Sequence, residues 1–174
     1  MATSHRHKEV KETMFKRILT VLTLSLAVLA SAPVRAQTAP DALVRQLSTE
    51  VIDAVKADKD IQAGNINKIM TLVDSKVMPH VNFPRMTAIA VGRPWRTAND
   101  TQKQRLQDEF KSLLVRTYAG ALTQVRDHTV QLKPFRAGAE DTEVVVRTEI
   151  KGKGDPIQLD YRMEKAATGW KIYD

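Results

Sequence analysis

Two histidines, His80 and His128, stand out after position 36 because imidazole serves both acid–base catalysis and metal binding. His80 follows a proline at a predicted helix end, and His128 follows Asp127 at a predicted helix-to-strand junction. A catalytic histidine needs a nucleophile and an orienting partner, and a zinc site needs further ligands at suitable spacing. Because neither requirement is met, we interpret both as surface or capping residues and predict no metal site.

The other groups that carry enzyme chemistry are missing or poorly placed. The chain has no cysteine, which excludes disulfides, thiolate zinc sites, iron–sulfur clusters and a cysteine nucleophile. The glycine-rich, serine-hydrolase and zinc-protease motifs of common enzymes are absent from the sequence. The acidic residues lie mostly on predicted polar faces or in turns. We interpret them as solvated charge and predict neither catalysis nor a cofactor.

One short segment, Gly92-Arg93-Pro94-Trp95-Arg96, places two arginines around an aromatic ring. Guanidinium groups and tryptophan are suited to phosphate groups or to a partner protein. Alternatively, Trp95 closes the end of the core while the arginines extend into solvent. The pattern leaves both interpretations open, and we take Arg93, Trp95 and Arg96 as candidate headgroup or partner contacts.

The first 36 residues have the pattern of a secretory signal peptide. Lys16 and Arg17 precede an uncharged apolar run over residues 18–32, and the small-residue pattern Val34-Arg35-Ala36 follows. These are the three parts of an export signal, and the run is shorter than the ~20 residues of a membrane span. Met14 would give a signal of ordinary length, so we interpret it as the natural start. The sequence thus predicts a protein exported to the periplasm.

The signal also carries most of the positive charge. Residues 1–36 hold six basic and two acidic residues, which leaves a net charge of +3, out of +7 for the whole chain, on residues 37–174. A weakly basic exported domain is a poor candidate for nucleic-acid binding, so we predict no nucleic-acid partner. Its length is sufficient for a single domain with its own core.

Apolar residues repeat at helical spacing in four segments between residues 40 and 126. Asn65 is a candidate N-cap for the second helix, which we expect Pro79 to stop, and Gly92 follows the third. Asn99 and Gln102 form a candidate capping box for the fourth. We expect its buried stripe to consist of Leu106, Phe110, Leu113, Leu114, Tyr118 and Leu122.

From His128 the apolar period changes to two, as in strands with one buried and one solvated face. Turn residues separate the alternating runs near positions 138–141, 152–155 and 168–169. Residues 37–174 therefore predict an α+β domain in which N-terminal helices pack on a curved antiparallel meander. The last strand stops after five residues without a closing turn, so we expect the natural chain to continue past Asp174.

Several ordered motifs resemble the MlaC family of periplasmic phospholipid-binding proteins, also known as the toluene-tolerance family. The resemblance covers the signal and residues 40–174, and is most specific at residues 77–83, 90–96, 102–110, 113–119 and 169–174. It implies an NTF2-like cone that encloses an apolar pocket for acyl chains, with headgroups near the mouth. It also implies a shuttle, without ATPase activity, between an outer-membrane lipoprotein–porin complex and an inner-membrane ABC transporter with MCE domains. Such transport maintains outer-membrane lipid asymmetry.

For that pocket we predict lining residues on the inward faces of the strands and helices. Exposing lipid tails costs ~0.8 kcal/mol per CH₂, so a carrier needs an apolar interior and no catalytic residue. We expect replacement of Leu159 or Val146 by Glu to abolish lipid binding. The predicted lining residues are Val144, Val146, Ile150, Ile157, Leu159, Tyr161, Met163, Met86, Ile89, Phe110, Leu114 and Tyr118.

Two other functions remain open at this point. Similar cones house isomerases and dehydratases, but these need an acid or base inside the cavity, and the inward strand positions carry no carboxylate or histidine. A periplasmic binding protein for another apolar solute would have the same walls. The identity of the bound molecule separates that alternative from a phospholipid carrier.

Overall fold

The helices precede the strands in the computed structural model, which describes residues 37–152 and 154–174. The predicted signal peptide, residues 1–36, lies outside the described residues. The chain forms α2 (Pro40–Ala57), α3 (Lys59–Gln62), α4 (Ile66–Leu72), α5 (Phe83–Val91) and α6 (Asp100–Gln124). Short 3₁₀ turns cover Met78–His80, Arg93–Arg96 and Val125–Asp127.

Side-chain caps start α4 and α6 where the sequence predicts them. The Asn65 side chain accepts hydrogen bonds from the backbone N–H groups of Asn67 and Lys68. At α6, Asn99 and Gln102 form both halves of a capping box, each at 2.9 Å. Such caps satisfy N–H groups that have no partner within the helix, and each contributes about 1 kcal/mol.

The second helix ends differently from the prediction. Its α-helical part stops at Leu72, and a π-helical turn, Val73–Val77, leads into the 3₁₀ turn that contains Pro79. Proline has no N–H and its ring clashes with the carbonyl four residues earlier, so a regular α-helix cannot run through it. Here the helix changes its hydrogen bonding before it reaches Pro79. π-Turns of this kind are rare and frequently lie at functional sites.

The strands form one antiparallel meander in the order β1-β2-β3-β4. Their bounds are β1 (Thr129–Leu132), β2 (Glu143–Lys151), β3 (Ile157–Ala166) and β4 (Gly169–Ile172). The register places Val146 opposite Tyr161 and Val144 opposite Met163, so the inward rows of β2 and β3 coincide. The predicted α+β class and the meander are confirmed.

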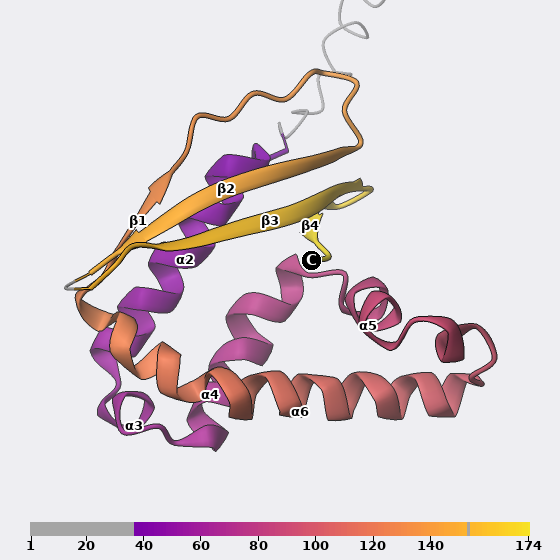
Figure 1. Ribbon diagram of the computed structural model, residues 1–174, viewed down its shortest axis with the longest axis horizontal. Helices are drawn as coiled ribbons and strands as arrows, with labels where there is room; N and C mark the ends of the chain where they lie inside the picture. The colour runs from indigo at the N-terminus through magenta and orange to yellow at the C-terminus, as the bar shows by residue number, and fades with distance from the viewer. Residues whose placement is uncertain (1–36, 153) are drawn as a thin grey trace, which may run out of the picture. The chain divides into compact units, whose positions relative to one another are not determined.

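Two hydrophobic cores divide the interior. Helix α2 packs against β1 and β2 on the inner face of the sheet (Figure 1). The sheet core lies there and consists of Leu43, Val44, Val146, Met163, Trp170 and Ile172. The helix core joins the end of α2 to α3, α4 and α6 and consists of Val55, Ile61, Ile69, Leu72, Val115 and Ala119.

Helix α6 half-buries Leu106, Phe110, Leu114 and Leu122 of its predicted stripe, but its fully buried residues are others. Leu113 and Tyr118 are 60% and 62% exposed, whereas the smaller Val115 and Ala119 are buried in the helix core. Val115 and Ala119 are four residues apart and therefore share one face of the helix. The prediction chose the largest apolar side chains, but α6 approaches its neighbours closely through small ones.

A polar network fastens α5 to one end of the two central strands, β2 and β3. Glu143 and Glu164 are directly opposite on β2 and β3, a position in which like charges repel. Arg85 bridges both carboxylates, and its guanidinium lies 3.6 Å from the centroid of the Tyr173 ring. Hydrogen bonds from Asn82 and then Arg85 lower the pKa of Glu164 below its usual range.

Among the described residues, no helix has the length and hydropathy of a membrane span.

Candidate functional site

The inner face of the sheet borders an apolar cavity of about 450 Å³, the sheet cavity. Its walls come from α2, from the sheet, from α5 and the segment that precedes it, and from the end of α6 and the turn that follows it. The apolar lining residues are Val44, Leu47, Val51, Ile52, Val77, Val81, Met86, Leu122, Val125, Val130, Ile150, Leu159, Tyr161 and Ile172.

A second apolar cavity of about 320 Å³, the helix cavity, lies among the helices. It is lined by Ile69, Val73, Val77, Met78, Val81, Phe83, Met86, Lys111, Leu114, Val115, Tyr118, Ala119 and Leu122. Four residues line both cavities and form their common partition: Val77, Val81, Met86 and Leu122. The two cavities are therefore neighbours that share one wall.

Few polar side chains line these cavities. In the sheet cavity Asp160 and Asp174 are ion-paired, with Arg147 at 3.2 Å and Arg162 at 3.6 Å. Both carboxylates are more than half exposed. Ser48 and Tyr161 add hydroxyl groups to the sheet cavity, and the rest of its wall is apolar. Walls made mostly of apolar side chains suit an apolar ligand, because a polar one would lose its hydration without replacement.

The structure brings six of the predicted lining residues to the two cavities. Ile150, Leu159 and Tyr161 line the sheet cavity, Leu114 and Tyr118 line the helix cavity, and Met86 lines both. Tyr118 does so although it is largely exposed, so it lies at the rim of the helix cavity.

The other predicted residues lie elsewhere. Val146 and Met163 are fully buried in the sheet core, and Val144 packs against that core. Ile89 and Ile157 are about half exposed and line neither cavity, and Phe110 stacks on Phe83 with ring centroids 5.7 Å apart. The sequence pattern places all of these residues on inward faces. In the structure, neighbouring side chains pack against some of them, and others are open to solvent.

Of the four partition residues the sequence analysis predicted Met86 as a lining residue, but it missed the other three and the α2 wall. Leu47 and Val51 belong to the apolar stripe of α2, and Val77 and Leu122 belong to the stripes of their own helices. The periodicity indicated that all four face inward. The pattern of a single helix does not indicate whether its inward face packs against a neighbouring element or is separated from it by a cavity. Periodicity therefore cannot distinguish a cavity wall from a packed core.

The segment with Arg93, Trp95 and Arg96 forms a corner between α5 and α6. Both arginines are exposed, and Trp95 is half-buried with the Lys103 ammonium 5.8 Å from its ring centroid. None of these residues lines either cavity. They therefore stand on the surface, away from both apolar cavities.

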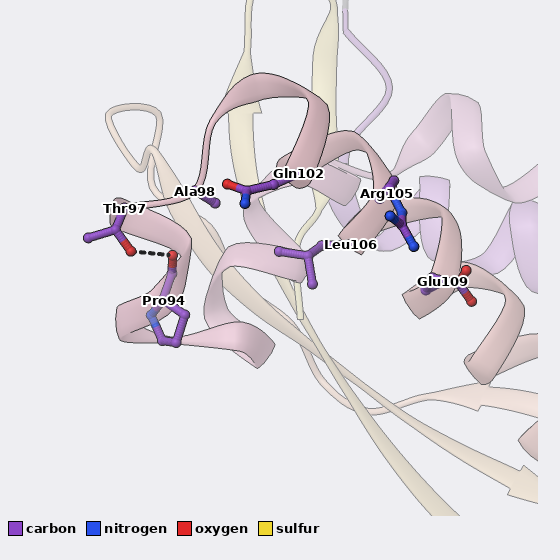
Figure 2. Close-up of a pocket in the computed structure, with 7 residues that line it drawn as sticks. All are labelled: Pro94, Thr97, Ala98, Gln102, Arg105, Leu106 and Glu109. Atoms are coloured by element: carbon purple, nitrogen blue, oxygen red, sulfur yellow. Dashed lines mark hydrogen bonds between the residues drawn. The ribbon is translucent and has the colours of Figure 1, made fainter.

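A surface groove of about 490 Å³, the corner groove, lies beside this segment. Figure 2 shows Pro94, Thr97 and Ala98 on one side and Gln102, Arg105, Leu106 and Glu109 of α6 on the other. The Thr97 hydroxyl donates to the Pro94 carbonyl at 3.1 Å. The polar lining residues Thr97, Gln102, Arg105 and Glu109 are all exposed, so this groove is more open to water and more charged than the two apolar cavities.

The two histidines lie outside the cavities. His80 is half-buried in the 3₁₀ turn after the π-turn. His128 is also half-buried, and its ring packs so closely on Gly152 that a Cβ there would lie 2.2 Å from Nε2. Within residues 37–152 and 154–174, no group of three or more His, Asp or Glu side chains could hold a metal ion.

Comparisons with known proteins agree with one another. The model of the MlaC protein family matches residues 45–174. The toluene tolerance protein ttg2D of Pseudomonas putida is 26% identical over 151 residues, which cover 84% of this chain and 70% of that protein. A solved structure of the phospholipid-binding protein of Ralstonia solanacearum, in complex with a phospholipid, is 50% identical with a TM-score of 0.75. That similarity covers 80% of this chain and 76% of the solved one.

Proposed function

The chain belongs to the MlaC family, and from this premise we propose that residues 37–174 form a single phospholipid-binding domain. The observation that carries the proposal is the pair of apolar cavities, about 450 and 320 Å³, that share the partition of Val77, Val81, Met86 and Leu122. A space of this kind holds acyl chains away from water. The related Ralstonia solanacearum protein was solved with a phospholipid bound.

The physical reason for such a protein is the cost of exposing lipid tails. Each CH₂ group left in water costs ~0.8 kcal/mol, so a two-chain lipid does not cross an aqueous compartment unaided at a useful rate. A protein that buries the tails removes most of this cost. It needs no catalytic group, only apolar walls and an opening through which the headgroup stays hydrated.

The wider role we propose is a shuttle in the periplasm, reached through cleavage of the signal in residues 1–36. Its partners would be an outer-membrane lipoprotein–porin complex and an inner-membrane ABC transporter with MCE domains, and its task the maintenance of outer-membrane lipid asymmetry. The corner with Arg93, Trp95 and Arg96 supports a docking role, because it is exposed and separate from the cavities.

An enzyme is disfavoured by the family and by the cavity walls. A catalytic acid or base in such a fold needs a desolvated position inside the cavity. The carboxylates that line the sheet cavity, Asp160 and Asp174, are more than half exposed and ion-paired. A binding protein for another apolar solute would have the same walls and is separated only by its ligand.

Native mass spectrometry tests the proposal. The full chain is expressed in a Gram-negative host, purified from the periplasm without detergent and analysed intact, and its lipids are then extracted. We expect a complex heavier than the protein by one diacyl phospholipid. A folded protein that carries no lipid, or that carries a different apolar molecule, would contradict the proposal.

A further inference from the structure

Lys111 is a charged residue in the otherwise apolar lining of the helix cavity. Among the described residues that line this cavity, it is the one side chain that carries charge at neutral pH. Its Nζ atom lies 2.8 Å from Oδ1 of Asp74, and the two side chains are 25% and 48% exposed. An ammonium group thus stands where an otherwise apolar cavity meets the surface.

The surroundings of Lys111 mark this position as the rim of the cavity. Asp74 belongs to the π-turn, and Val73 and Val77 of the same turn line the cavity. On α6, Tyr118 follows Lys111 by seven residues, so both lie on the same side of the helix. Tyr118 is 62% exposed and still lines the cavity. The seam between the π-turn and α6 is therefore an opening to solvent.

We propose that Lys111 is the residue that binds the phosphate of a phospholipid at this opening. With an acyl chain in the helix cavity, the phosphate would meet the Lys111 ammonium in the place that Asp74 now takes. This inference rests on the function proposed above and names a headgroup subsite within it. The ligand chemistry is a phosphate anion attached to an apolar chain.

Charge and solvation favour this exchange. A phosphate cannot follow the tails into walls that offer no hydrogen bonds, so it stops at the first cation on the rim. A charge-assisted hydrogen bond to an ammonium is stronger than one between neutral groups. Both side chains of the Lys111–Asp74 pair are partly exposed, and exposed ion pairs are weak, so a phosphate displaces Asp74 at little cost.

A purely structural role for the Lys111–Asp74 pair makes a different prediction. If the pair only holds α6 against the π-turn, loss of either partner has the same consequence. If Lys111 binds phosphate, the two losses differ, because Asp74 competes with the ligand for the same ammonium. The comparison of K111M with D74N therefore separates the two roles.

The chain also provides a matched control on the same π-turn. Lys76 pairs with Glu50 at 3.1 Å and lines neither cavity. The substitution K76M removes a lysine and an ion pair next to the seam without touching the opening. Its effect measures what the loss of an ordinary surface ion pair does here.

In the test, the full chain and each variant are incubated with vesicles that contain equal amounts of dioleoyl phosphatidic acid and dioleoylglycerol. These two lipids have the same tails and differ only in the phosphate. The bound lipids are extracted and their ratio is measured. We expect K111M to lower the ratio of phosphatidic acid to diacylglycerol about tenfold. D74N should leave this ratio unchanged or raise it, and K76M should leave it unchanged.

An unchanged ratio in K111M, or equal losses in K111M and D74N, would overturn the inference. In both cases lipid uptake by the wild-type chain would leave the proposed function standing, whereas absence of uptake in the wild type would contradict that function itself. Titration with inorganic phosphate alone separates a lipid headgroup from a free anion. We expect no binding that depends on Lys111 in that arm, and such binding would overturn the assignment to a lipid.

Discussion

The two ends of β3 carry the same alternating pattern but have different surroundings. At one end Met163 is fully buried against Trp170 and Ile172, whereas at the other end Leu159 and Ile157 are 38% and 48% exposed. Tyr161 lies between them and is half-buried. The inward row therefore runs from a filled core, through the wall of the sheet cavity, to solvent. An inward position can thus serve the stability of the fold or the binding of a ligand.

The reason for the difference lies in the elements that cover each end. The start of α2 and strand β4 supply the side chains that fill the space over Met163 and Val146. Leu159 instead borders the sheet cavity, whose other walls include residues of α2 and the end of α6. Filled space stabilises through close packing, and empty apolar space is what a ligand can fill.

Replacement of Val146 by Glu should have the largest effect on stability. Val146 is completely buried at the filled end, and an unpaired carboxylate there would lose its hydration without any partner. We expect no cooperative unfolding transition and no near-ultraviolet circular dichroism. The control is V145E, the adjacent outward position opposite Arg162, where the carboxylate stays in solvent beside a cation. A folded V146E protein would break the distinction between the two ends.

Truncation of Met163 to Ala should cost about 2–5 kcal/mol of unfolding free energy, because it leaves a cavity in a packed core. The same truncation at Leu159 should cost less, since that side chain is partly exposed and already borders empty space. Urea denaturation of the full chain measures both. Equal losses at the two positions would show that the ends do not differ in packing.

The polar network at the filled end predicts a dependence of stability on pH. Glu164 has its pKa lowered from 4.5 by the Asn82 hydrogen bond and then by Arg85. Its contribution is fully present above the unfolded-state pKa and is lost as the pH falls through the lower pKa of the folded state. We expect E164Q to lose about 1 kcal/mol at pH 7 and to show a shallower loss of stability in acid. Parallel pH profiles for E164Q and the wild type would contradict this account.

Replacement of Leu159 by Glu should have the smallest effect on stability and a large one on binding. The new carboxylate can reach water from this position, so we expect the unfolding free energy to change by less than about 1 kcal/mol. A charge in the wall of the sheet cavity would oppose an acyl chain, and we expect no lipid after detergent-free purification. Extraction and mass analysis of lipids from L159E measure this. A folded L159E protein with a normal lipid content would remove Leu159 from the site.

The sequence was sufficient for the elements and their faces but not for the space between them. Local signals predicted the Asn65 cap, the Asn99–Gln102 capping box and the alternation of the strands because each depends on neighbouring residues. The burial of Val115 and Ala119 in place of Leu113 and Tyr118 depends on how closely α6 approaches α4, which no local period encodes.

The cavity walls show the same limit. Val146 and Leu159 have identical places in the alternating pattern, and only the tertiary arrangement makes one core and the other cavity wall. Likewise, Lys111 belongs to a polar position in the sequence pattern of α6, and its place at a cavity rim becomes visible only once the π-turn lies beside it.

The position of bound acyl chains tests the central proposal most directly. A crystal structure of the full chain with a phospholipid brominated on its acyl chains would locate them through the anomalous signal of bromine. We predict bromine in the sheet and helix cavities, beside the partition residues Met86 and Leu122, with Met163 unmoved. Bromine in the corner groove between Pro94 and Leu106, or on the outer face of the sheet, would contradict the proposal that these two cavities hold the lipid.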